Sequence, residues 1–320
     1  MKLYKKYILK VLFLIPRNSI SLFIIRHLKY YIPRLEMIYD PNFQRKIFNG
    51  FSSSEKYLLM ESNRITYLVN VNDHIGYKMY VNGFFDESVI QVASIFDLKE
   101  NDIFLDIGAN IGSICLPIAE KFSCTCVAIE ASKINGWQLL RNAVLNPQLK
   151  IIPFILAVGD KEFVKNQMVE LNINPGNLGA NSLLSNWNIA DTSENVKELV
   201  KPVMVDSLVK IINFDNIKFI KLDVEGFEIN VIKGMNNLID KRIPIIFEWR
   251  VDLSINPDDQ ILSLQSLLGK NYDFHKVCTS ESGNIYFSKF DPAIKAENVL
   301  ALDKDSDFKN EVIKCYDIMT

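Results

Sequence analysis

The chain has 320 residues, of which 48% are hydrophobic and 23% are charged, and its formal net charge is −2. This length and composition are typical of one large α/β domain with an appendage, or of two modest domains, and they argue against disorder over most of the chain. Residues 1–34 contain eight lysines and arginines and no acid, so subtracting eight positive charges from −2 leaves −10 on the rest. That acidic balance argues against nucleic-acid binding.

Cysteine and histidine usage indicates the compartment and the metal chemistry. The five cysteines are an odd number and most of them lie in apolar runs, which is typical of reduced, buried thiols in the cytoplasm rather than of a secreted disulfide framework. None of the three histidines has the spacing of metal ligands. We therefore expect a cytoplasmic protein, and no metal site is predicted.

The basic amino-terminal segment, residues 1–34, contains two apolar runs, Ile8–Ile15 and Ile20–Ile25, interrupted by charged residues and Pro16. Neither run reaches the roughly 18 apolar residues of a spanning helix, and no small-residue cleavage site follows. On a helical wheel, lysines gather on one face and apolar side chains on the other. Two interpretations stay open: a helix docked on the protein body or on a dimer partner, or peripheral contact with the anionic inner face of a membrane.

The first predicted elements lie outside the regular part of the chain. Ile65–Val69 and Tyr77–Val81 alternate around Asn72–Gly76, which predicts a β-hairpin. Residues 1–83 are therefore expected to form an extension made of a basic helical segment and a hairpin. A helix with one apolar face is predicted from about Asp86.

From residue 103 onward, apolar runs typical of buried strands alternate with helical patterns. This alternation predicts an α/β domain with a mostly parallel, doubly wound sheet of seven strands. The strands are expected at Ile103–Ile107, Cys124–Glu130, Ile151–Val158, Ile217–Asp223, Ile243–Trp249, Tyr272–Cys278 and Asn284–Phe290, and the main helices at Gly112–Lys121, Lys133–Leu145, Glu225–Leu238 and Asp258–Leu268.

Two segments break this rhythm. Residues 160–202 are rich in Asn, Gly and Ser, and they are expected to form an inserted β-structure or loop over the sheet. The last thirty residues are charged. We therefore expect residues 84–290 to form the main domain and residues 291–320 a peripheral tail.

The string Asp106-Ile-Gly-Ala-Asn-Ile-Gly112 ends the first core strand and opens the first helix. Ligands of doubly wound sheets bind at such strand ends, and Gly108 and Gly112 allow a tight turn and a close backbone approach. A dinucleotide-binding turn has glycine where Asn110 stands. The Asp106 carboxylate would repel a pyrophosphate but attract the ammonium group of S-adenosylmethionine. The turn therefore favours S-adenosylmethionine over NAD.

Glu130 ends the second core strand, 24 residues after Asp106. An acid at this place can accept hydrogen bonds from both ribose hydroxyls of a bound nucleoside. The alternative is a solvated glutamate at a strand end. Because the turn upstream and the acid occur together at the expected spacing, the ribose-binding role is favoured.

The string Ile220-Lys-Leu-Asp-Val-Glu-Gly-Phe-Glu228 ends the fourth strand and opens the next predicted helix. Helix capping and the helix dipole suffice to explain Glu228. Asp223 ends a central strand and should face the ligand crevice. No histidine ends any of the first five core strands, so carboxylates are the candidates for proton transfer. We expect Asp223 to orient an acceptor and Glu225 to take its proton.

Together with Ala157-Val-Gly-Asp160, these strings resemble the FkbM family of methyltransferases in order and spacing, over about residues 84–290. The resemblance implies a Rossmann-like methyltransferase fold, S-adenosylmethionine as the methyl donor, and a hydroxyl acceptor on a sugar, glycan or natural product. It places cofactor contacts on Asp106, Gly108, Asn110 and Glu130, with Ala109, Gly112 and Ala157 completing the pocket, and the reaction near Asp223 and Glu225. Ala131 stands where the family commonly has proline, which changes the stiffness of that loop.

Other hypotheses remain open. Asn177–Ser182 is either an acceptor-binding loop or a plain surface loop. Glu248 ends the fifth strand near Asp223, but no second Asp or Asn beside it supports a metal site. An NAD-dependent oxidoreductase on the same fold is the main functional alternative, and a non-catalytic cofactor-binding scaffold is another. Acids buried at strand ends argue against the scaffold, because burying carboxylates is costly.

Overall fold

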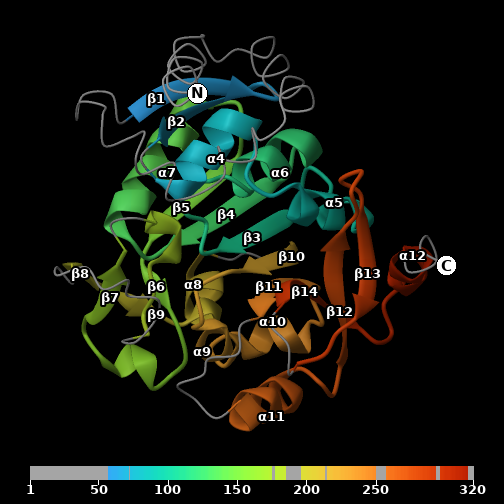
Figure 1. The fold of residues 1–320 in the computed structure, drawn as a ribbon. Coiled ribbons are helices and arrows are strands. Elements are labelled where there is room, and N and C mark those ends of the chain that lie inside the picture. The colour runs from blue at the N-terminus through green and yellow to red at the C-terminus, as the bar shows by residue number, and fades with distance from the viewer. Residues whose placement is uncertain are drawn as a thin grey trace, which may run out of the picture.

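The computed structural model of the protein describes residues 57–71, 73–174, 177–184, 196–212, 215–249, 257–292 and 296–315. The described part is built on an eight-stranded sheet in the order β13-β12-β14-β11-β10-β3-β4-β5 (Figure 1). In chain order the strands are β3 (Ile103–Ile107), β4 (Thr125–Glu130), β5 (Ile151–Ile155), β10 (Ile217–Leu222), β11 (Ile245–Trp249), β12 (Tyr272–Thr279), β13 (Ile285–Lys289) and β14 (Ala296–Asp303).

The strand order makes this sheet doubly wound. Strands β3, β4, β5, β10 and β11 run parallel, and β3 lies between β4 and β10. The chain therefore builds one side of β3 first and the other side later, which creates the switch point where ligands bind in such sheets. Strand β14 runs antiparallel between β11 and β12, and β13 runs antiparallel beside β12. The predicted mostly parallel, doubly wound fold is confirmed.

Helices cover both faces of the sheet (Figure 1). Neighbouring strand residues point to opposite faces. Phe104 and Phe219 belong to the core on the side of α4–α7, whereas Leu105 and Ile220 belong to the core on the side of α8–α11. The helices are α4 (His74–Asn82), α5 (Glu87–Ile95), α6 (Cys115–Phe122), α7 (Lys133–Leu145), α8 (Val205–Ile212), α9 (Glu228–Ile232), α10 (Asn236–Asp240), α11 (Pro257–Leu267) and α12 (Lys309–Lys314).

An amino-terminal hairpin is present, but it begins earlier in the chain than predicted. The second predicted strand, residues 77–81, is wrong because these residues are helical. The hairpin pairs β1 (Tyr57–Ser62) with β2 (Ile65–Asn70), and residues 77–81 belong to α4. The helix begins because the Asp73 carboxylate accepts hydrogen bonds from the backbone N–H groups of residues 75 and 76, and it ends at Gly83 with φ 84°. Ile75, Tyr77, Met79 and Tyr80 are all buried, so the apolar residues belong to a short helix that is buried around most of its circumference rather than to a strand.

The prediction of a peripheral tail after residue 290 is also wrong. All seven predicted sheet strands are present, and β14 is an eighth that lies between β11 and β12. Its residues Val299, Leu300, Ala301 and Leu302 are fully buried. This apolar run is short and flanked by charged residues, so its pattern alone did not distinguish it from a solvated segment.

The insertion after β5 consists of small paired strands, as expected. β6 (Ala157–Val158) pairs in parallel with β9 (Pro202–Val203), and β7 (Val169–Ile173) pairs antiparallel with β8 (Val196–Val200). The single helix predicted over residues 225–238 is instead the two short helices α9 and α10. Residues 1–34 lie outside the described residues. No helix in the described part of the chain is long and apolar enough to cross a membrane.

Candidate active site

A cavity of about 890 Å³ lies at the switch point, at the carboxyl ends of β3, β4, β10 and β11, and extends toward α4 and β12. The structure brings most of the predicted site residues together in its wall. Six of them line the cavity: Gly108, Ala109, Asn110, Glu130, Asp223 and Glu225. The other three, Asp106, Gly112 and Ala157, are buried and do not belong to the lining.

The glycine turn after β3 packs directly against the end of β10. Gly108 has φ 83°, a backbone conformation that glycine adopts readily and other residues rarely do. A Cβ atom on Gly108 would lie 1.7 Å from the carbonyl oxygen of Asp223. The backbone N–H groups of Gly108 and Ala109 both donate to the carbonyl oxygen of Ile129, at 2.9 and 3.0 Å, which joins the turn to β4. The turn is therefore fixed between the two strand ends that carry Glu130 and Asp223.

Glu130 is buried, and each of its carboxylate oxygens accepts a backbone hydrogen bond. The N–H of Asn110 donates to one oxygen and the N–H of Ser132 donates to the other, both at 2.8 Å. Burial raises the pKa of Glu130 to about 7, against the lowering effect of the two backbone donors. A carboxylate oxygen can accept more than one hydrogen bond, so Glu130 keeps acceptor capacity on the side that lines the cavity.

The side chain of Asp106 is completely buried and does not line the cavity, whereas its neighbour Lys221 does. Asp106 and Lys221 stand opposite each other on β3 and β10, and their side chains share one face of the sheet. The Lys221 Nζ lies 3.4 Å from Asp106 and 3.3 Å from Asp223. Burial raises the pKa of Asp106, and the ammonium group of Lys221 opposes that shift. Burial lowers the pKa of Lys221, but the two carboxylates outweigh it and raise the pKa overall.

Glu225 lies in a loop and does not begin a helix, which corrects the sequence prediction. It has φ 54°, and Gly226 after it has φ 95°. The Glu228 carboxylate at the start of α9 holds this loop by accepting from the N–H groups of Val224 and Gly226, at 3.0 and 3.2 Å. Ser182 contacts the loop from the insertion, since its Oγ donates to the carbonyl oxygen of Glu225 at 2.7 Å. The loop conformation thus depends on two buried polar side chains.

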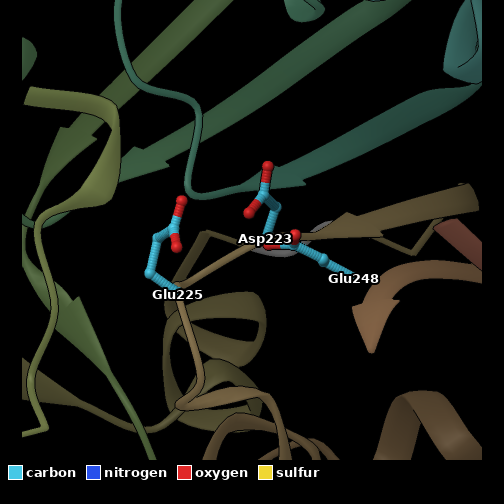
Figure 2. Close-up of side chains that lie close together, drawn as sticks. All are labelled: Asp223, Glu225 and Glu248. Carbon is cyan, nitrogen blue, oxygen red and sulfur yellow. The ribbon is translucent and has the colours of Figure 1, made fainter. Parts of the chain in front are cut away.

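Three carboxylates lie close together beside this loop. Asp223, Glu225 and Glu248 lie within 4.8 Å of one another when measured between carboxylate oxygens, and Figure 2 shows them converging from the ends of β10 and β11. Such a group of oxygen ligands could bind a cation, and it could also accept a proton from a ligand. The sequence placed Glu248 near Asp223, and the structure confirms that proximity.

The segment 177–184 forms another part of the wall, so it is more than a surface loop. Leu178 is held at both of its backbone groups: its N–H donates to Asp73 at 2.7 Å, and its carbonyl oxygen accepts from the Nδ2 of Asn135 at 2.8 Å. Asp73 caps α4 and Asn135 lies in α7. Ser182 at the other end contacts the Glu225 loop. The insertion is therefore attached to both helices and to the carboxylate loop.

Sequence reasoning missed the roles of Lys221 and Asp73 and the contact between Ser182 and the Glu225 loop. The capping role predicted for Glu228 is confirmed, since its carboxylate accepts from the backbone N–H groups just before α9. Lys221 could have been recognised from the sequence, because it is a charged residue between Ile220 and Leu222 near the end of a buried strand and must have a partner. Asp73 precedes a helix as a cap residue does, but the hairpin interpretation concealed that signal. The Ser182 contact joins residues 43 positions apart, and no local pattern indicates it.

The fold and the cavity define a doubly wound α/β protein with a ligand site at its switch point. The family model of the methyltransferase FkbM domain matches residues 106–279, so the chain belongs to the FkbM methyltransferase family, as the sequence predicts. No curated protein matches the sequence of the chain.

Solved structures resemble the chain only distantly. A precorrin-6y C5,15-methyltransferase from Geobacter metallireducens is 10% identical, with 68% of this chain and 87% of that chain covered and a TM-score of 0.36. The TYW2 protein of M. jannaschii, in complex with AdoMet, is 13% identical, with 78% and 87% covered and a TM-score of 0.39. At these values neither structure supports an inference about the ligand or substrate of this chain. The family assignment rests on the family model.

Proposed function

We propose that the chain is an S-adenosylmethionine-dependent O-methyltransferase whose acceptor is a hydroxyl group on a sugar, glycan or natural product. The observation that carries the proposal is Glu130, a buried carboxylate in the cavity wall of a chain that belongs to a methyltransferase family. Its oxygens are fixed by two backbone donors, and a rigid carboxylate at the end of the second core strand suits the two hydroxyls of a ribose.

In this proposal, the cofactor lies along the glycine turn. Gly108, Ala109 and Asn110 provide backbone next to the cavity without a bulky side chain at the point of closest approach. The ribose would bind Glu130, and the methionine part would extend toward the end of β10. Asp106 is too deeply buried for direct contact, so its charge would act through Lys221 rather than on the ammonium group of the cofactor. S-adenosylmethionine supplies a methyl group on a positively charged sulfur.

The acceptor hydroxyl is proposed to lie between the turn and the carboxylate loop. Holding its oxygen in line with the methyl group and excluding water would supply much of the rate enhancement. A hydroxyl is a weak nucleophile, so a positioned base would add roughly 10²–10⁴-fold. We assign orientation of the hydroxyl to Asp223 and proton removal to Glu225. The proximity of Glu248 supports this role, since it brings a third carboxylate to the place where the hydroxyl group would lie.

The test uses amide variants, which keep shape while removing basicity. Asp223→Asn and Glu225→Gln should bind S-adenosylhomocysteine as the wild type does, yet lose most of their methyl transfer. Transfer is measured by mass spectrometry after incubation with S-adenosylmethionine and a panel of sugars, glycans and natural products. Glu162→Gln, an exposed acid paired with Lys165, is the matched control. Full activity in both amide variants would place the base elsewhere, and saturable binding of NAD instead of S-adenosylmethionine would favour the oxidoreductase alternative.

Location and partners are proposed on the sequence alone. A cytoplasmic enzyme fits the cysteine usage, and residues 1–34 would contact either a membrane surface or another protein surface.

A further inference from the structure

The buried ammonium group of Lys221 has a role that the proposed reaction leaves unassigned. Lys221 is 7% exposed and lies in the wall of the cavity. Its Nζ has three acceptors within reach: Asp106 at 3.4 Å, Asp223 at 3.3 Å and the carbonyl oxygen of Gly108 at 3.3 Å. The contact with the Gly108 carbonyl oxygen is a hydrogen bond, and the contacts with Asp106 and Asp223 are ion pairs. Three groups of the protein therefore hold the ammonium group in place.

These contacts join the two strand ends on which the site is built. Gly108 belongs to the turn after β3, and Asp223 follows directly after β10. The Gly108 backbone already packs against the carbonyl oxygen of Asp223, as the close approach of its Cβ position shows. Lys221 adds a polar connection between the same two segments. Asp223 is partly exposed, with 36% of its side chain accessible, so it is free to turn unless a partner restrains it.

Asp106 explains how the charge of Lys221 is maintained. An isolated lysine loses its proton readily when it is buried, because burial penalises the charged form. Asp106 is completely buried on the same face of the sheet and does not line the cavity, whereas Lys221 does. One carboxylate therefore balances the ammonium group from inside the protein, and the ammonium group is left to hold the second carboxylate at the cavity.

We infer that Lys221 is a positioning residue that fixes the Asp223 carboxylate toward the acceptor, and that Asp106 is its counter-ion rather than a cofactor ligand. The inference rests on the proposed function, because it concerns the reaction assigned to this cavity. Lys221 acts through Asp223 and through the Gly108 turn, and it does not contact the acceptor.

The experiment separates the structural and functional parts of this pair. Lys221→Met removes the ammonium group but keeps the length of the side chain. It leaves Asp106 buried without a partner, so the variant should be clearly destabilised in urea unfolding. The double variant Lys221→Met/Asp106→Asn removes both buried charges and should recover most of the stability. Lys218→Met is the matched control, since Lys218 lies on the same strand but is exposed.

Activity then distinguishes positioning from packing. The double variant should bind S-adenosylhomocysteine within about threefold of the wild type in calorimetry, yet show kcat for methyl transfer reduced by at least tenfold. Lys221→Arg, which keeps a positive charge at this place, should recover part of the rate. A double variant with wild-type kcat would overturn the positioning role, and a stable single Lys221→Met variant would overturn the counter-ion role of Asp106. Wild-type protein that neither binds S-adenosylhomocysteine nor transfers methyl groups would instead contradict the proposed function.

Discussion

The pKa of Glu130 leads to a quantitative prediction for cofactor binding. Burial raises this pKa to about 7, so near neutral pH the side chain exists in both forms. Ribose hydroxyls donate hydrogen bonds to the ionised form, and protonation turns one acceptor oxygen into a donor. Cofactor affinity should therefore rise as the pH rises through 7 and reach a plateau above it. Below the pKa, each pH unit reduces the ionised fraction about tenfold, equivalent to about 1.4 kcal/mol.

The assay is calorimetric titration with S-adenosylhomocysteine between pH 5.5 and pH 8. From pH 8 to pH 6, the dissociation constant of the wild type should increase by about tenfold, given one group with a pKa near 7. Glu130→Gln should bind more weakly at pH 8, by about 1.5–3 kcal/mol for lost charge-assisted hydrogen bonds. Its affinity should no longer depend on pH in this range, because the titrating group is gone.

Glu228 provides a strict control for this experiment. Burial raises its pKa to about 7 as well, and its carboxylate also accepts two backbone hydrogen bonds. Unlike Glu130, it does not belong to the cavity lining. Glu228→Gln should therefore keep the pH dependence of binding. The reasoning is refuted if folded Glu130→Gln protein retains the wild-type pH profile, or if the wild type shows none.

Four further outcomes are expected. Gly108→Ala should lower the free energy of unfolding, measured in urea, by more than about 2 kcal/mol, because the added Cβ atom would clash with the backbone of Asp223. Gly283 also has a positive φ, 84°, but it has open space around it, so Gly283→Ala should lower that free energy only by the backbone strain of about 1 kcal/mol. Ser182→Ala should lower methyl transfer but not S-adenosylhomocysteine binding, because it releases the Glu225 carbonyl group. Chelation with EDTA should leave transfer unchanged, and its loss with recovery on adding Mg²⁺ would assign a cation to the Asp223 cluster. Removing residues 1–34 should abolish co-sedimentation with anionic liposomes, whereas an altered oligomeric state with lipid binding unchanged would favour the docking-helix interpretation.

The central part of the fold could be predicted from the sequence because its signals are local. Buried parallel strands such as β3 and β4 are continuous apolar runs, and each ends at a turn or an acid that the sequence displays directly. Doubly wound connections then place those ends at one edge of the sheet. That is why Gly108, Asn110 and Glu130 were expected in one pocket, and why the structure brings them together.

Other features depend on partners far away in the sequence. Strand β14 is buried only because β11 and β12 both pair with it, and its own four apolar residues gave too little pattern. The helix α4 is fixed in part by the bond between Asp73 and Leu178, which are 105 positions apart. The turned backbone of Glu225 is held by Ser182 and Glu228, so the local string alone favoured a helix start. In each of these cases, contacts with residues distant in the sequence determine the conformation, and the local secondary-structure propensity does not.

The buried acids of this protein show why geometry must decide the assignment of the base. Glu130 and Glu228 have similar burial and similar pKa values, so a raised pKa alone does not separate a ligand-binding acid from a structural one. In both, backbone N–H groups hold the carboxylate in a fixed place. Asp106 is held in turn by Lys221. Within the described part of the cavity, the acids that converge on one another are Asp223, Glu225 and Glu248. A base must approach the acceptor oxygen at the reaction site, and this cluster is where the geometry permits that approach.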